Sequence, residues 1–138
     1  MSAVATAVQD RPRARVRTVV GAVVAAVLVN LVVYAVGRLA GGDFTFTRDD
    51  GRATVDAVTV AGFTAVPLGA GLTLVGLLAD RLRWVPRVAA VVAPLLAVAT
   101  ILVMTVPVDL DAVSTATLAT CHLTLVPVSL LAIRRLRR

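Results

Sequence analysis

Lysine and glutamate are absent from this chain, and cysteine and histidine occur once each. A single cysteine excludes an intramolecular disulfide and any Cys-x-x-Cys redox or metal-binding motif. Aromatic residues make up only 4% of the sequence, which argues against the stacking platforms that bind single-stranded nucleic acid. The chain therefore lacks the residues on which several common kinds of functional site depend, and we expect no nucleic-acid partner.

Carboxylates are missing from the long apolar stretches. All eight acidic residues are aspartates, and each lies in a polar connection or near the end of an apolar run. Proton-coupled carriers generally place an Asp or Glu within the membrane, so a small multidrug exporter is disfavoured. No Ser-His-Asp set, His-rich metal motif or glycine-rich phosphate loop is present. We therefore expect no enzyme activity, no catalytic or metal site and no cofactor.

Apolar sequence is what this chain has in excess. Hydrophobic residues make up 59% of it and its mean hydropathy is +0.93, which indicates a bilayer as the solvent. Four apolar runs are joined by polar connections, and the predicted spans cover residues 18–38, 57–79, 88–108 and 112–133. Since about 20 helical residues cross the hydrocarbon core, the sequence predicts an all-α membrane protein with a bundle of four transmembrane helices.

The chain divides into one membrane domain and two basic tails. Residues 1–17 are polar, contain four alternating arginines and are expected to be disordered. Residues 18–133 form the membrane domain, and residues 134–138 form the second tail. A signal peptide is the competing interpretation of the first run. The run is longer than a typical hydrophobic region of such peptides and no Ala-x-Ala site follows it, so we expect a retained span.

Arginine is distributed very unevenly between the two sides of the predicted bundle. The two tails and the second connection together carry 11 arginines, whereas the first and third connections carry 3. An arginine excess marks the cytoplasmic side, so both termini are expected in the cytoplasm. The use of arginine and aspartate alone is typical of a high-GC bacterial genome. We therefore expect a multi-pass protein of the bacterial inner membrane whose arginines attract anionic lipid headgroups.

The first connection, residues 38–56, is the only sizeable loop. The segment Asp43-Phe-Thr-Phe-Thr alternates polar and apolar residues, and Asp49-Asp-Gly51 is typical of a turn. A short extracytoplasmic β-hairpin and an irregular loop are both consistent with this pattern, since an isolated hairpin is marginally stable. Phe44 and Phe46 are placed to anchor the loop at the outer membrane surface.

Polar side chains occur at similar depth on three of the predicted spans. Asn30 and His122 lie near the centres of the first and fourth spans, and Thr100 lies slightly past the middle of the third. Tyr34 shares a helical face with Asn30. These four residues are the candidate intramembrane polar contacts. For His122 three interpretations stay open: a structural hydrogen bond to Asn30, proton or ligand handling, and haem or metal ligation.

Small residues recur at four-residue spacing and predict the faces on which helices meet. These stripes are Ala61, Ala65, Gly69 and Thr73; Ala89, Ala93 and Ala97; and Ala112, Ala116, Thr120 and Thr124. Two functions remain open. One is a structural or accessory membrane component that associates with itself or with another membrane protein. The other is a small transporter or channel subunit that uses the polar level of Asn30 and His122.

Three segments resemble a family of small four-helix membrane proteins of unknown function from high-GC bacteria. They are Val27-Leu-Val-Asn-Leu-Val-Val-Tyr34 ahead of Gly37-Arg38, the glycine-rich second span leading to Asp80-Arg-Leu-Arg83, and Ala119-Thr-Cys-His-Leu123. The resemblance implies the fold and the membrane location. It implies no activity, because the family has no assigned chemistry.

Overall fold

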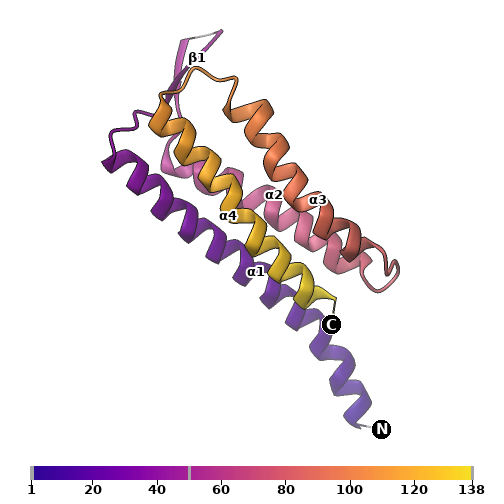
Figure 1. Ribbon diagram of the computed structural model, residues 1–138. Coiled ribbons are helices and arrows are strands. Elements are labelled where there is room, and N and C mark those ends of the chain that lie inside the picture. Colours follow the sequence, from indigo (N-terminus) through magenta and orange to yellow (C-terminus); the bar gives the residue numbers. More distant parts are fainter. Residues whose placement is uncertain (1, 50, 138) are drawn as a thin grey trace.

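The chain folds into four long helices and one short hairpin. The computed structural model describes residues 2–49 and 51–137 (Figure 1). The elements are α1 (Ser2–Leu39), β1 (Thr45–Arg48), β2 (Gly51–Thr54), α2 (Ala57–Leu78), α3 (Val85–Thr100), a π-helical turn (Ile101–Thr105) and α4 (Ala112–Leu136). All four helices are long and apolar enough to cross a membrane. The predicted fold class is therefore confirmed, and the first loop is a hairpin rather than irregular.

The ends of the helices differ from the predicted spans at several positions. The third membrane-length segment begins at Val85 rather than residue 88, because Pro86 suits the first turn of a helix, where no N–H partner is lost. α4 continues past residue 133 to Leu136. Its last turn carries Arg134 and Arg135, and positive charge there interacts favourably with the negative end of the helix dipole.

The amino-terminal segment also differs from the prediction. The sequence predicts a disordered tail over residues 1–17, but α1 is helical from Ser2 onward. This segment is rich in alanine, which has the highest helix propensity, and it extends a helix that is already nucleated. Met1, Asp50 and Arg138 lie outside the described residues. The predictions for the two chain ends and for the hairpin turn therefore stay predictions at these three positions.

The hairpin pairs β1 with β2 in antiparallel register, from Thr45 opposite Thr54 to Arg48 opposite Gly51. It lies at one end of the bundle, beside the α3–α4 connection (Figure 1). Both described chain ends and the α2–α3 connection lie at the opposite end. These are named the hairpin end and the arginine end below.

α1 is the helix that holds the bundle together. It packs mainly against α2 and α4, whereas α3 packs mainly against α4 and only slightly against α2. The main apolar core lies toward the arginine end and comprises Leu72, Val75, Val85, Ala132, Ile133 and Leu136. Large apolar side chains on every helix point outward, such as Val32, Phe63 and Val103. Faces of this kind contact acyl chains in a membrane, so close packing and hydrogen bonds must hold the helices together.

α1 and α4 approach closely at Gly37. A Cβ atom added at Gly37 would lie 2.3 Å from Oγ1 and 2.6 Å from Cγ2 of Thr117, well inside the contact distance of about 3.5–4.0 Å. The Thr117 hydroxyl donates to the Val113 carbonyl oxygen at 2.7 Å, which holds the side chain in this position. Glycine at position 37 is therefore required for the two backbones to meet.

Replacing Gly37 by alanine should lower the free energy of unfolding by about 1–3 kcal/mol, because the added methyl group overpacks the contact with Thr117. Unfolding of the purified protein in mixed micelles, followed by circular dichroism, measures this loss. Gly21→Ala is the matched control in the same helix, since a Cβ atom there meets nothing within 4 Å. Equal losses in the two variants would contradict the prediction.

Candidate functional site

Asn30 lies at the centre of a polar contact that joins three helices. Its side chain, on α1, is 1% exposed. The Nδ2 group donates to Oγ1 of Thr64 on α2 at 2.9 Å, and Oδ1 accepts a hydrogen bond from the Thr124 hydroxyl on α4. Both ends of the amide are therefore hydrogen-bonded inside the bundle, as buried polar groups require.

Cys121 completes this contact on the α4 side. Its buried thiol lies 3.8 Å from the backbone carbonyl oxygen of Asn30 and donates to it. Cys121 and Thr124 are three residues apart and therefore share one face of α4. The polar node is defined here as Asn30, Thr64, Cys121 and Thr124.

His122 is not the hydrogen-bond partner of Asn30 that the sequence suggests. Asn30 bonds Thr64 and Thr124 rather than His122, and the structural interpretation of His122 as the partner of Asn30 is wrong. Adjacent residues on a helix point about 100° apart, so a helix that turns Cys121 toward α1 turns His122 aside, where it is only partly buried. Within residues 2–49 and 51–137, no three His, Cys, Asp or Glu side chains gather as metal ligands would.

The other two candidate residues bond elsewhere. The Tyr34 hydroxyl donates to the carbonyl oxygen of Val55 at 3.0 Å and so belongs to the hairpin end. The Thr100 hydroxyl donates to the Leu96 carbonyl oxygen of its own helix at 2.7 Å. Of the four candidates, the structure brings only Asn30 into the node.

Thr64, Cys121 and Thr124 are the residues that the polar-depth argument missed. The α4 face toward α1 and the loop that follows it has 3-4-3 spacing, through Ser114, Thr117, Cys121 and Thr124. The predicted stripe on α4 uses strict four-residue spacing instead. Its members Ala112, Ala116 and Thr120 are exposed and only Thr124 faces the node, so this stripe is wrong as a marker of the bundle interior. Helices that cross at small angles meet along a seam of period 3.5, and that spacing is the signal that finds these residues.

Phe44 closes the hairpin end. It is fully buried and adopts a φ of 58°, a left-handed conformation that costs of order 1–3 kcal/mol for a residue other than glycine. Its N–H donates to the Ser114 hydroxyl oxygen at 2.9 Å, and its ring lies 4.7 Å from that of Tyr34 between centroids. Phe44 therefore packs inside the protein, and the prediction that it anchors the loop at the membrane surface is wrong.

Two aspartates of the α3–α4 connection hold the hairpin segment. Asp109 accepts hydrogen bonds from the Thr47 hydroxyl at 2.6 Å and from its N–H at 2.8 Å. Asp111 caps α4 by accepting from the Ser114 N–H and hydroxyl, and it also accepts from the Asp43 N–H. The donors at Thr47 hold the pKa of Asp109 below its usual range, and the donors at Ser114 do the same, more strongly, for Asp111.

With this geometry in view, comparison with known protein families matches residues 10–138 to a family of unknown function (DUF6069). The chain belongs to this family. The matched region contains the polar node, the hairpin and the α3–α4 connection, and it confirms the predicted membership of a family of unknown function. No curated protein and no solved structure matches the DUF6069 chain.

The polar node should contribute measurably to the stability of this DUF6069 chain. Asn30→Leu keeps the branched shape and the number of heavy atoms of the side chain but removes two interhelical hydrogen bonds, each contributing about 0.6 kcal/mol on average and at most about 1.7. The free energy of unfolding in bicelles should fall by about 1–3 kcal/mol. His122→Leu is the matched control and should change it by less than about 0.5 kcal/mol. A larger loss for His122→Leu than for Asn30→Leu would contradict this assignment.

The hairpin end should loosen in acid. The pKa of Asp109 is lower in the folded protein than its ordinary value of 3.8, so its contacts stabilise the hairpin above that value and are lost as the pH falls through the folded pKa. The exchange protection of the Thr47 N–H should therefore hold above about pH 5 and decrease as the pH falls from there to about 2. Asp109→Asn keeps an acceptor oxygen but does not titrate, so its protection should depend less on pH. An identical pH dependence in both proteins would contradict the role of Asp109.

Proposed function

We propose that this DUF6069 member is a structural or accessory component of the bacterial cell membrane without catalytic activity. The observation that supports this most directly is that the hydrogen bonds of the polar node are made within the bundle. The amide of Asn30 uses its donor and its acceptor within the bundle and is 1% exposed. A side chain that selects or relays a cargo needs a polar group that faces a water-filled path. The Asn30 amide instead joins α1, α2 and α4.

The positions of the hollows support the same proposal. One hollow of about 680 Å³ lies at the arginine end. Another, of about 540 Å³, is an apolar groove on the outside of the bundle between α1 and α4. Asn30, Thr64 and Thr124 line neither of these two hollows. The geometry therefore favours the accessory role over a transporter or channel that passes the level of Asn30 and His122.

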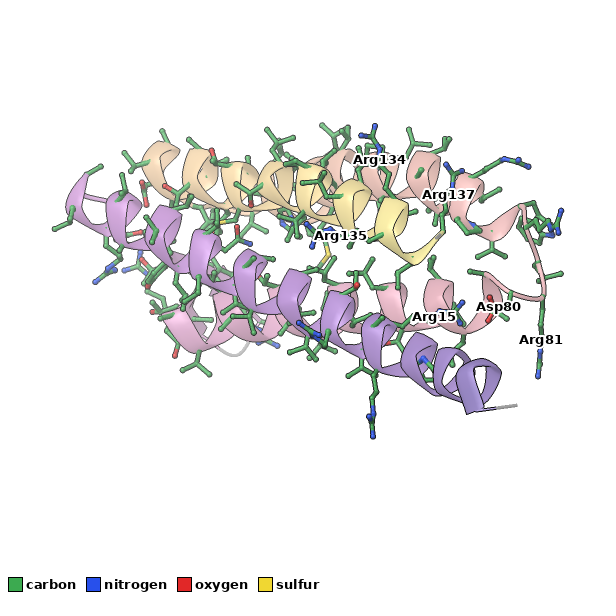
Figure 2. The ribbon with its side chains drawn as sticks, turned by 90° about the horizontal axis from the view of Figure 1, so that it is seen from below. Arg15, Asp80, Arg81, Arg134, Arg135 and Arg137 are labelled. Atoms are coloured by element: carbon green, nitrogen blue, oxygen red, sulfur yellow. The ribbon has the colours of Figure 1, made fainter. Side chains whose placement is uncertain are left out.

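The distribution of arginine supports an orientation with both termini in the cytoplasm. Figure 2 shows labelled arginines of α1, of the α2–α3 connection and of α4 toward the same end of the bundle. The tails and the α2–α3 connection together carry 11 of the 14 arginines, and an arginine excess next to membrane spans is typical of the cytoplasmic side. This end would then meet the anionic lipid headgroups of the cytoplasmic leaflet.

The outer faces of the helices are where a protein partner would bind. Ala112, Ala116 and Thr120 line the groove between α1 and α4, and small residues on a lipid-facing surface allow another helix to approach closely. The proposed partner is a second copy of this chain or another membrane protein. The accessory role consists of that association.

Flux measurements in proteoliposomes test the accessory role against the transport role. Vesicles that contain the full-length protein and a pH-sensitive dye should relax a proton gradient no faster than protein-free vesicles, because the node leaves no polar group open to a path. Asn30→Leu protein serves as the matched control. A proton flux in the original protein that Asn30→Leu abolishes would contradict the accessory role and support the channel.

A further inference from the structure

A hollow of about 680 Å³ opens at the arginine end, between α1, the α2–α3 connection with the start of α3, and the end of α4. Among the described residues, five arginines and one aspartate line it, and these six side chains together carry a formal charge of +4. This hollow is named the arginine pocket. Like charges that gather in one hollow repel each other, and a bound anion relieves that repulsion.

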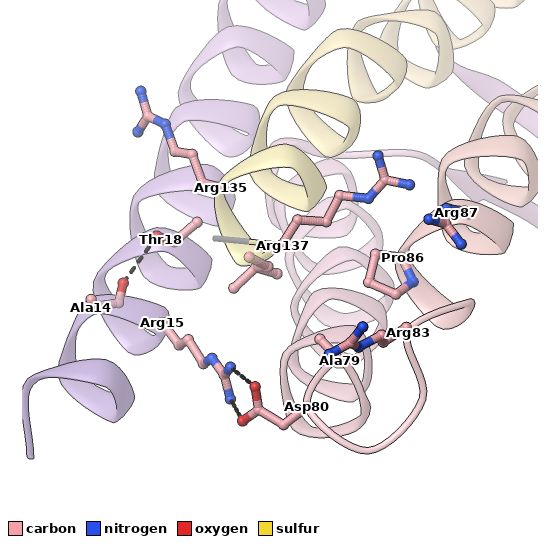
Figure 3. A pocket seen from close by; sticks show the side chains of 11 residues that line it. Ala14, Arg15, Thr18, Ala79, Asp80, Arg83, Pro86, Arg87, Arg135 and Arg137 are labelled. Atoms are coloured by element: carbon pink, nitrogen blue, oxygen red, sulfur yellow. Dashed lines mark hydrogen bonds and ion pairs between the residues drawn. The ribbon is translucent and has the colours of Figure 1, made fainter. Parts of the chain in front are cut away.

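One ion pair shapes the pocket. Arg15 on α1 binds Asp80, in the α2–α3 connection, through its two terminal guanidinium nitrogens, at 2.6 and 2.7 Å (Figure 3). A bidentate pair of this kind orients both side chains. It joins α1 to the α2–α3 connection and leaves an excess of four arginines in the pocket wall.

The remaining arginines lie in two groups. Figure 3 shows Arg137 extending from the end of α4 toward Pro86 and Arg87, with Arg83 on the same side, whereas Arg135 extends to the other side of the α4 end. A single phosphate can pair with one such group, whereas a headgroup with two phosphates joined by a short polyol bridge offers one phosphate to each. Guanidinium groups match the geometry of phosphate oxygens.

Part of the pocket lining is apolar. Pro86 and Leu136 line it and are buried, and Leu136 belongs to the core cluster of α2, α3 and α4. Each of these helices has an outward face of large apolar side chains that begins next to the pocket. Acyl chains can therefore lie along the helices while their headgroup occupies the pocket, an arrangement that a soluble anion does not need.

We propose that the arginine pocket binds a dianionic phospholipid whose headgroup carries two phosphates on a glycerol-like bridge, the chemistry of cardiolipin. Arg83, Arg87 and Arg137 bind one phosphate, and Arg135 binds the other. The proposal rests on the membrane placement given above, with the arginine end at the membrane surface. It goes beyond general attraction to anionic lipid because it names the pocket and the number of phosphates.

Lipid titration of the full-length protein in neutral detergent tests the site. Native mass spectrometry counts the bound lipid, and Trp84, the only tryptophan and the neighbour of Arg83, reports binding by fluorescence. Cardiolipin should bind about tenfold more tightly than phosphatidylglycerol, which has one phosphate, and phosphatidylcholine should not compete. Arg83→Gln with Arg137→Gln should weaken cardiolipin binding by about tenfold or more.

Arg81→Gln with Arg134→Gln is the matched control. These arginines are exposed, belong to the same connection and the same helix, and lie outside the pocket lining; Figure 2 shows Arg81 pointing away from the bundle. The control removes the same charge and should change cardiolipin affinity by no more than about twofold. If the two double variants lose equal cardiolipin affinity, the lipid is held by the overall positive charge of the arginine end rather than by the pocket, and the proposal is overturned.

Two further binding measurements distinguish the possible ligands, and one fusion protein tests the membrane orientation. If inorganic pyrophosphate displaces cardiolipin and binds equally well alone, the occupant is a soluble anion and the lipid proposal is overturned. If phosphatidylglycerol binds as tightly as cardiolipin, the two-phosphate proposal is overturned. Green fluorescent protein fused after Arg138 tests orientation separately. A dark fusion contradicts the proposed cytoplasmic termini, whereas the detergent titration still decides the site.

Discussion

The hydrogen bonds of one buried amide are the interactions on which the bundle depends. Lipid surrounds the outer faces of the helices, so burial of apolar surface gives no net drive for helices to associate. Asn30 supplies a directional alternative by donating to Thr64 on α2 and accepting from Thr124 on α4. Both partners are hydroxyl groups on other helices. The contact therefore sets the relative heights of α1, α2 and α4, and a sliding of any one helix would leave a buried polar group without its partner.

The contacts nearer the hairpin end depend on that alignment. The close approach of Gly37 to Thr117 lies two turns from Asn30 on α1 and requires the same relative height of α1 and α4. Beyond it, Ser114 accepts the N–H of Phe44 and bonds Asp111, which joins the first loop to the start of α4. The strained backbone of Phe44 is offset there by full burial of its ring against Tyr34. At the other end, Arg15 and Asp80 connect α1 to the α2–α3 connection.

Much of this architecture follows from local composition. The four apolar runs predict the four helices, since helix length and hydropathy are properties of consecutive residues, and Asp49 to Gly51 marks the hairpin turn. The ends were less predictable. α1 begins near the start of the chain instead of at residue 18, because alanine-rich sequence extends an existing helix even when it is polar and basic. The candidate site was predicted in part: Asn30 is at its centre, but Tyr34, Thr100 and His122 bond or lie elsewhere.

The sequence by itself determined that four apolar segments alternate with polar connections and that arginine is concentrated on one set of connections. Those properties need no knowledge of which helix lies beside which. Only the tertiary structure decided that Asn30 meets Thr64 and Thr124, that His122 is turned aside, and that Phe44 packs inward. The physical reason is rotational. Depth along a span follows from counting residues, whereas the direction of a side chain depends on how each helix is rotated about its axis, and that rotation is set by packing against its neighbours.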